Sequence, residues 1–174
     1  MIKILLFATL ALSVGAFRAD AEPLRIVAIG ASNTHGWYIG TQAAYPAQLQ
    51  VRLAEAGIDA QVTNAGVPFD TTGMMSDRLE RDVPRGTDIV ILQPGGNDLR
   101  FLGTRERRAA NIAAMTRRLQ ARGIKVVVYD DDIPLRYYTL DFIHLTRDGH
   151  TMIAAALLPR IMELAAARHR KAVR

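Results

Sequence analysis

The sequence predicts an α/β protein: a doubly wound parallel sheet of four to five strands covered by helices on both faces, that is, a three-layer α/β/α sandwich. Two short runs, at residues 26–29 and 89–92, are apolar throughout, a third at residues 124–129 is apolar except for Lys125, and residues 58–63 alternate as a strand does. Segments with the apolar spacing of helices separate these runs. Continuous apolar strands that alternate with helices are typical of a parallel sheet buried on both faces.

Residues 1–21 have the pattern of a cleavable signal peptide. Lys3 gives a basic start, residues 4–17 are apolar, and Ala19-Asp20-Ala21 has the small-x-small pattern of a signal-peptidase site, which predicts cleavage after the second alanine. A membrane-spanning helix needs about 20 apolar residues, and Arg18 ends this run too early. We therefore expect no stable membrane anchor after cleavage and a periplasmic or secreted protein.

Residues 22–174, the expected mature chain, are long enough to form a single domain with a buried core. Lys3, Arg18 and Asp20 fall in the leader, so the mature part holds 20 basic and 16 acidic residues and a net charge of +4. This excess is mild and fits solvated helix faces, so we expect no nucleic-acid partner. Cysteine is absent, which excludes disulfides and thiolate metal sites.

In the first half of the chain, each predicted strand is followed by a predicted loop or helix with clear start and end signals. The first strand stops at Gly30, and a polar loop is expected over residues 33–41. Pro46 suits the first turn of the next helix, and Gly57 is placed to end it. The second strand then runs into another glycine, Gly66.

The second half repeats this alternation. Thr71 or Thr72 is expected to cap a short helix, and the third strand ends in the polar cluster at residues 94–98. Thr104 begins a long helix that Gly123 ends before the fourth strand. Each strand is thus followed by polar or small residues.

The end of the chain departs from the alternation. Only a short connector, residues 131–140, separates the fourth strand from Asp141, so a fifth strand is expected to be absent or a fragment at residues 135–139. Thr146 is expected to cap a last helix. Pro159 should kink or restart that helix, because a proline inside a helix loses a backbone hydrogen bond and clashes with the preceding turn.

Residues with catalytic chemistry follow the strands. Active sites of doubly wound sheets form outside the carboxyl ends of the strands, where Ser32, Gly66 and Asn97 follow the first three strands and Asp141 and His144 lie in the last loop. Serine, histidine and aspartate together catalyse acyl transfer: the imidazole removes the serine proton, and the carboxylate orients the imidazole. The backbone N–H groups of Ser32 and Gly66 and the amide of Asn97 are candidate donors to an oxyanion.

These four blocks resemble those of the SGNH hydrolases, also called the GDSL lipase/esterase family. Ser32 matches the first block, Gly66 the second, Asn97 in Gly-Gly-Asn-Asp the third, and Asp141 and His144 the Asp-x-x-His block. The chain is most similar to the small bacterial thioesterase, lysophospholipase and arylesterase branch. The resemblance implies a flavodoxin-like sandwich, a serine esterase or thioesterase acting on a small acyl ester or thioester, and no metal or organic cofactor.

Two features depart from the family pattern. The usual Gly-Asp-Ser reads Gly30-Ala31-Ser32, and Asn33 stands where an apolar residue is common. The connector at residues 131–140 is also short, where relatives usually carry another helix and strand. These departures leave a second hypothesis open, a catalytically impaired SGNH scaffold that binds an acylated lipid or glycan.

Other features have two interpretations. Trp37 and Tyr38 follow the candidate nucleophile and either line the substrate site or pack on the neighbouring helix. The run Asp130-Asp131-Asp132 has oxygen ligands suited to Mg²⁺ or Ca²⁺, but a turn after the fourth strand explains it more simply. A basic nucleic-acid-binding domain is a third, much weaker hypothesis.

Overall fold

The computed structural model describes residues 22–101 and 103–172, so the predicted signal peptide lies outside the described residues. Four parallel strands form the sheet, β1 (Leu24–Gly30), β2 (Ala60–Gly66), β3 (Ile89–Gln93) and β4 (Lys125–Val128), in the order β2-β1-β3-β4. The chain adds β2 on one side of β1, whereas β3 and β4 extend the other side. The strand order therefore reverses between β1 and β3, the place where such sheets bind ligands.

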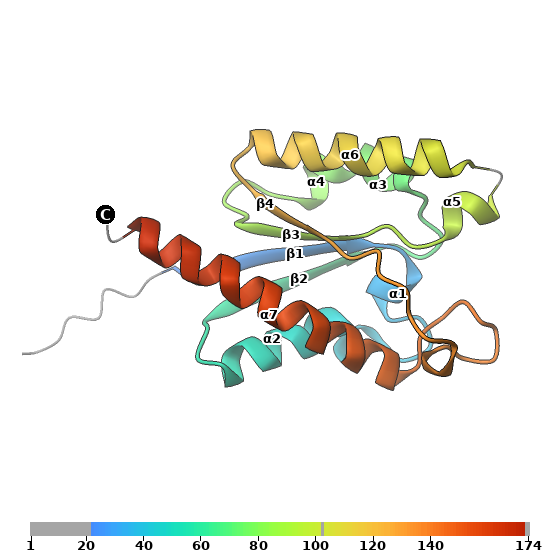
Figure 1. Cartoon of the computed structure of the whole chain (residues 1–174), viewed down its shortest axis with the longest axis horizontal. Coiled ribbons are helices and arrows are strands. Elements are labelled where there is room, and N and C mark those ends of the chain that lie inside the picture. Colours follow the sequence, from blue (N-terminus) through green and yellow to red (C-terminus); the bar gives the residue numbers. More distant parts are fainter. Residues whose placement is uncertain (1–21, 102, 173–174) are drawn as a thin grey trace, which may run out of the picture.

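Helices cover both faces of the sheet (Figure 1). The helices α3 (Thr72–Asp77), α4 (Leu79–Asp82) and α6 (Arg105–Ala121) lie on one face. The helices α2 (Tyr45–Glu55) and α7 (Arg147–Ala172) lie on the other face and pack against each other. The predicted three-layer sandwich is confirmed.

Strand β1 supplies both halves of the core, because successive side chains of a strand point to opposite faces. Ile26 and Ala28 belong to the cluster that includes Leu49 of α2. Val27 and Ile29 belong to the second cluster, on the side of α3, α4 and α6. Burial on both faces explains why β1 has a continuous apolar sequence.

The helix boundaries follow the predicted signals. Pro46 lies in the first turn of α2, and Gly57, just after that helix, has a left-handed backbone with φ 75°. The hydroxyl of Thr71 caps α3 by accepting a hydrogen bond from the N–H of Met74. Thr104 caps α6 in the same way.

Three short helical segments surround the carboxyl ends of the strands where the sequence predicts only polar loops. They are α1 (Ser32–His35), the 3₁₀ turn η1 (Thr41–Ala43) and α5 (Asn97–Arg100). A single helical turn is too short to show a 3.6-residue period, so the sequence pattern cannot reveal it. These turns decide where Ser32 and Asn97 are placed.

The end of the chain agrees with the expected absence of a fifth strand and differs from expectation at Pro159. Within the described residues no fifth strand joins the sheet: the connector forms a 3₁₀ turn, η2 (Leu135–Tyr137), and one antiparallel bridge between Tyr138 and Leu145. Helix α7 does not restart at Pro159, which lies inside it. Pro159 is exposed, and buried Leu157 and Ile161 on either side hold both halves of the helix against the core.

Among the described residues, no helix has both the length and the apolar character needed to cross a membrane. Figure 1 shows the chain segments α1, α5 and the connector gathered at one end of the sheet, beyond the carboxyl ends of the strands.

Candidate active site

Ser32 is placed at the sheet edge by a sharp turn at the end of β1. Gly30 permits this turn, because a Cβ at that position would lie 2.0 Å from Oγ1 of Thr34. Ser32 is then the first residue of α1, with 8% of its surface exposed. The turn therefore holds the candidate nucleophile where the loops after the strands converge.

A buried arginine fixes the end of β1 from the side of α3 and α4. The Arg78 guanidinium donates to the carbonyl oxygen of Gly30 at 3.0 Å and forms ion pairs with Asp70 and Asp82, each at 2.5 Å. Arg78 is 7% exposed and Asp70 6%. Since a buried charge must be paired, this cluster ties the strand end to the loop after β2.

Ala31, which replaces the family aspartate, lies in apolar surroundings. It is buried and belongs to the same core cluster as Met75 and Leu79. The charged anchor of the nucleophile turn comes instead from Arg78 and Asp70 through the carbonyl of Gly30. The turn is thus organised without a carboxylate at position 31.

Asp141 and His144 form the predicted pair within one tight loop. Nδ1 of His144 lies 2.5 Å from Oδ2 of Asp141, while Oδ1 accepts hydrogen bonds from the N–H groups of His144 and Ile143, both at 2.9 Å, and from the Thr139 hydroxyl at 2.7 Å. These donors, led by the His144 N–H, hold the pKa of Asp141 well below its usual range. A carboxylate that stays charged fixes the imidazole with its Nε2 directed away from Asp141.

Aromatic side chains pack around the imidazole. The ring of Trp37 stacks on His144 with centroids 5.7 Å apart, and Tyr38 meets it edge-on at 5.1 Å. Trp37 also contacts Phe69. These contacts place Trp37 and Tyr38 at the candidate site. Tyr38, Phe69 and Phe142 all have left-handed backbones, with φ of 69°, 69° and 56°, a strained conformation for bulky residues that is often found at functional sites.

In the described part of the chain, the structure records no hydrogen bond between Oγ of Ser32 and the ring of His144. The two residues are nevertheless linked through Asn33, whose side chain bonds to the backbone on both sides of His144. Catalytic hydrogen bonds of enzymes without substrate are often long and shorten in the substrate complex. The arrangement therefore fits a nucleophile and a base on two segments that Asn33 joins before substrate binds.

Asn97 lies beside Ser32 in a cavity of about 200 Å³, which is also lined by Arg100, Tyr138 and Phe142. Its side-chain amide donates to the carbonyl oxygen of Asp70 at 2.9 Å and is largely buried. A side-chain amide has two N–H donors, so one remains for a ligand. The structure thus brings Ser32 and Asn97 to one cavity.

Gly66 lies at the end of β2, where its backbone is in close contact with α1. A Cβ at this position would lie 2.2 Å from the backbone nitrogen of His35. Its own N–H donates to Oδ1 of Asn64 at 3.0 Å, and Asn64 donates in turn to the carbonyl oxygen of Thr34 at 2.8 Å. In this structure the Gly66 N–H is therefore already engaged, and the close contact with α1 leaves room for no larger residue.

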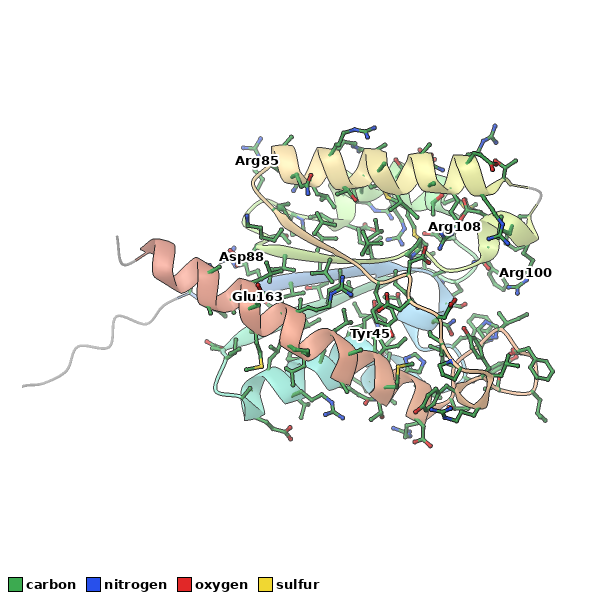
Figure 2. All side chains as sticks on the ribbon, in the orientation of Figure 1. Tyr45, Arg85, Asp88, Arg100, Arg108 and Glu163 are labelled. Atoms are coloured by element: carbon green, nitrogen blue, oxygen red, sulfur yellow. The ribbon has the colours of Figure 1, made fainter. Side chains whose placement is uncertain are left out.

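Sequence reasoning missed the residues that support the site: Asn33, Asn64, Asp70, Arg78 and Arg108. Arg108 illustrates why, since the sequence places it in an arginine-rich helix that is typical of a solvated face. In the structure Arg108, labelled in Figure 2, donates to the carbonyl oxygen of Gly95 at 3.0 Å and forms a two-pronged ion pair with Asp130. Only the contact partner, which lies far away in sequence, distinguishes it from its neighbours.

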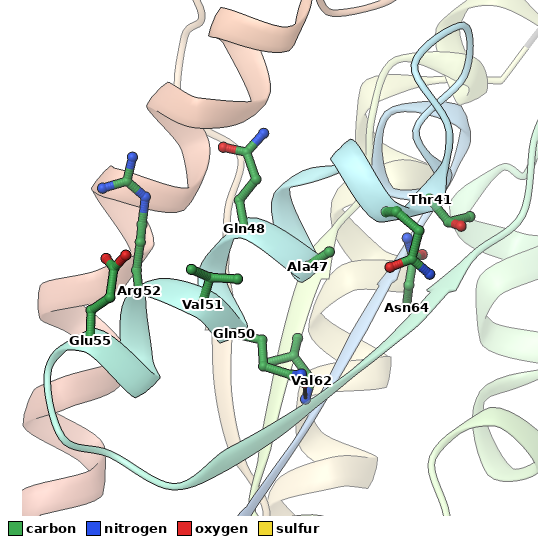
Figure 3. A pocket seen from close by; sticks show the side chains of 10 residues that line it. Thr41, Ala47, Gln48, Gln50, Val51, Arg52, Glu55, Val62 and Asn64 are labelled. Carbon is green, nitrogen blue, oxygen red and sulfur yellow. Dashed lines mark hydrogen bonds between the residues drawn. The ribbon is translucent and has the colours of Figure 1, made fainter.

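The described residues offer no group of three or more His, Asp or Glu side chains arranged to hold a metal ion. Asp130 pairs with Arg108, and Asp131 lies 3.9 Å from Arg160. A separate hollow of about 750 Å³ lies between α2 and β2 (Figure 3) and is lined by polar side chains that include Gln48, Gln50 and Asn64. It does not include Ser32, Asn97 or His144.

Comparison with known proteins gives a consistent result. Residues 28–139 match the model of the GDSL-like Lipase/Acylhydrolase family. The chain is 32% identical to Esterase TesA of Pseudomonas aeruginosa over 145 residues, which cover 79% of this chain and 68% of that protein. It is 28% identical to an arylesterase of Vibrio mimicus over 115 residues, which cover 65% of this chain and 57% of that protein.

Solved structures agree with this result. A crystal structure of TesA superposes with a TM-score of 0.73 at 20% identity, covering 80% of this chain and 99% of that one. The esterase AlinE4, described as an SGNH-hydrolase family member, gives a TM-score of 0.60 at 29% identity over 68% of this chain and 65% of its own. With the sheet, the family match and these relatives in agreement, the chain belongs to the GDSL-like lipase/acylhydrolase family, the SGNH hydrolases.

Proposed function

We propose that this carboxylic ester hydrolase cleaves esters or thioesters through an acyl-enzyme on Ser32. The observation that carries the proposal is the 2.5 Å Asp141–His144 pair, which Asn33 joins to the turn that presents Ser32. Asp141 remains a carboxylate because its pKa is lowered, so it can stabilise the imidazolium that forms when His144 accepts a proton. In this proposal Ser32 is the nucleophile, His144 the base and Asp141 the residue that orients the base.

In the first half of the reaction, Oγ of Ser32 attacks the acyl carbon while Nε2 of His144 takes the hydroxyl proton. The negative charge develops on the former carbonyl oxygen, which the N–H of Ser32 and the free amide hydrogen of Asn97 would stabilise. Gly66 is the third proposed donor. Its N–H would have to turn from Asn64 toward the oxyanion or donate to both in a bifurcated hydrogen bond. Each such donor typically contributes about 3 kcal/mol to transition-state stabilisation.

Collapse of the intermediate breaks the bond to the alcohol or thiol, which leaves with the proton from His144. A water molecule then attacks the acyl-enzyme, and His144 again takes and returns a proton. The products are a carboxylic acid and free Ser32. None of these steps needs a metal or organic cofactor.

A serine-directed fluorophosphonate probe tests the nucleophile. We expect the probe to label the wild-type chain on Ser32 and to leave Ser32→Ala unlabelled, with loss of p-nitrophenyl acetate and butyrate hydrolysis. Undiminished hydrolysis by Ser32→Ala would rule out the proposal. A wild type that binds acylated lipid or glycan, yet turns over no faster than His144→Ala, would instead support the non-catalytic scaffold.

We further propose that the protein is exported, on the basis of the signal-peptide pattern in residues 1–21. Expression of the full chain with a C-terminal tag in a Gram-negative host tests this. A mature form that begins at Glu22 in the periplasmic or culture fraction is the expected result. An uncleaved cytoplasmic chain would contradict it.

A further inference from the structure

The side chain of Asn33 forms hydrogen bonds with the residues on both sides of His144, the candidate base. Its Nδ2 donates to the carbonyl oxygen of Ile143 at 3.0 Å, and its Oδ1 accepts from the N–H of Leu145, also at 3.0 Å. Both bonds join residues that lie more than one hundred positions apart in sequence, and His144 is the residue between them. A single amide therefore spans His144 as a neighbouring strand would.

Among the residues that the structure describes, the other hydrogen bonds of the backbone at residues 143 and 144 stay within the same loop. The N–H groups of Ile143 and His144 donate to Asp141, and the carbonyl oxygen of His144 accepts from the N–H of Thr139 at 2.8 Å. These bonds orient the imidazole relative to Asp141. They do not position the loop relative to the nucleophile.

Asn33 provides that second connection. Residues 139–145 are joined to the part of the chain before η2 by two hydrogen bonds, both from Asn33, and the described residues offer no others. The connector that leads into the loop contributes no strand that could hold it to the sheet. Trp37 and Tyr38 pack on the His144 ring and Leu145 is buried in the core. The hydrogen bonds that join this loop to the nucleophile turn come from the residue that directly follows Ser32.

We infer that Asn33 is a positioning residue that sets the distance between Ser32 and His144 and thereby the rate of acylation. This inference rests on the proposed function. Since Asn33 is adjacent to Ser32 in α1, any movement of the nucleophile turn carries the histidine loop with it. Misplacement of reacting groups by about 1 Å can cost about a hundredfold in rate, so two bonds at this point have a large effect on turnover.

Two variants distinguish the loss of the Nδ2 donor of Asn33 from the loss of both its hydrogen bonds, which together we call the Asn33 clamp. Asn33→Ala removes both bonds, whereas Asn33→Asp keeps an acceptor for Leu145 but places a carboxylate against the carbonyl oxygen of Ile143. For both we expect kcat on p-nitrophenyl acetate to fall by about tenfold or more, with KM changed less than about twofold. The rate of fluorophosphonate labelling should fall by the same factor.

Gln48 provides a matched control. It too is a side-chain amide that bridges two elements, since it donates to the carbonyl oxygen of Ala43 and accepts from the hydroxyl of Thr151 on α7. We expect Gln48→Ala to lower the melting temperature about as much as Asn33→Ala and to leave kcat within about twofold of wild type.

A double-mutant cycle distinguishes positioning from general stabilisation. If Asn33 acts through His144, then Asn33→Ala should change the residual rate of a His144→Ala enzyme by less than about twofold. An equal loss of rate in both backgrounds would overturn the inference, as would a folded Asn33→Ala enzyme with wild-type kcat.

Hydrogen exchange gives a readout that does not depend on activity. The amide of Leu145 donates to Asn33, so its exchange should accelerate by about tenfold or more in Asn33→Ala and stay unchanged in Gln48→Ala. Absence of wild-type turnover and labelling would refute the proposed function. In that case an unchanged Leu145 exchange rate in Asn33→Ala would still overturn the clamp, and an accelerated one would support it.

Discussion

The guanidinium of Arg78 donates a 3.0 Å hydrogen bond to the carbonyl oxygen of Gly30, two residues before Ser32, although 48 positions separate the two in sequence. The same guanidinium is paired with Asp70, and the carbonyl oxygen of Asp70 accepts from Asn97. The nucleophile turn and the proposed oxyanion donor thus share one buried support.

Replacement of this support should destabilise the fold. Arg78→Met leaves the buried carboxylate of Asp70 without its partner, and breaking a buried ion pair costs about 3–5 kcal/mol. Urea unfolding should show a loss of this order. Arg81→Met is the control, because Arg81 is exposed and pairs with Asp82 at the surface, a contact worth about 1 kcal/mol at most. Equal losses in the two variants would contradict the role of Arg78.

Gly66→Ala should damage the site although it keeps the backbone N–H. The added methyl would lie 2.2 Å from the backbone nitrogen of His35, so α1 and Ser32 must move. We expect kcat/KM for p-nitrophenyl acetate to fall by about tenfold or more. Gly73→Ala is the matched control, because its new Cβ would meet no atom closer than 3.6 Å. Comparable activity of Gly66→Ala and Gly73→Ala would show that close contact is unimportant.

Asn97→Ala should act on turnover more than on binding. Loss of an oxyanion donor typically lowers kcat by about 10²–10³-fold, while KM should change little because the donor acts on charge that develops in the transition state. Steady-state kinetics with p-nitrophenyl butyrate measure both constants. Asn111→Ala, which also removes an amide hydrogen bond, here to Thr72 at 2.9 Å, should leave kcat nearly unchanged. A drop in kcat below about threefold for Asn97→Ala would argue against an oxyanion role.

Stability should fall on mild acidification because of His150. Burial lowers the pKa of His150 to about 4 from an ordinary value of 6.5, with Arg147 adding to the effect, and its Nδ1 accepts from the N–H of Tyr45. The unfolded chain therefore binds a proton between these pH values that the folded chain does not. His150 thus contributes full stability above pH 6.5, and this contribution is lost as the pH falls toward 4.

Urea unfolding at two pH values checks this expectation. Between pH 7 and pH 5 the free energy of unfolding should fall by roughly 2 kcal/mol through this residue. His150→Asn keeps an acceptor for Tyr45 but does not titrate, so its stability should change much less over the same interval. An equal pH dependence in both proteins would assign the effect to other groups.

Several parts of the fold could be predicted because their signals are local. The apolar run of β3, the cap at Thr104 and the left-handed Gly57 each depend on nearby residues alone. The continuation of α7 through Pro159 could not be predicted, because the residues around Pro159 pack on the core and keep the helix in one piece. The turns α1 and α5 are also invisible in the sequence, since one turn has no period.

In the candidate site, too, some features could be predicted from the sequence and others could not. The order of Ser32, Gly66, Asn97, Asp141 and His144 along the chain is sufficient to predict the family and the edge of the sheet where the candidate site is expected. The parallel order of the strands explains this, because it brings every strand's carboxyl end to one edge.

How those residues are held depends on contacts between distant segments. Three contacts join segments that are distant in sequence: the hydrogen bond from Arg78 to Gly30, the contact of Gly66 with α1, and the two bonds from Asn33 to the histidine loop. Hydrogen bonds of this kind form only when donor and acceptor lie about 3 Å apart, a precision that a strand and helix pattern does not specify. The sequence alone determined the fold class and the chemical groups, and long-range packing determined their geometry.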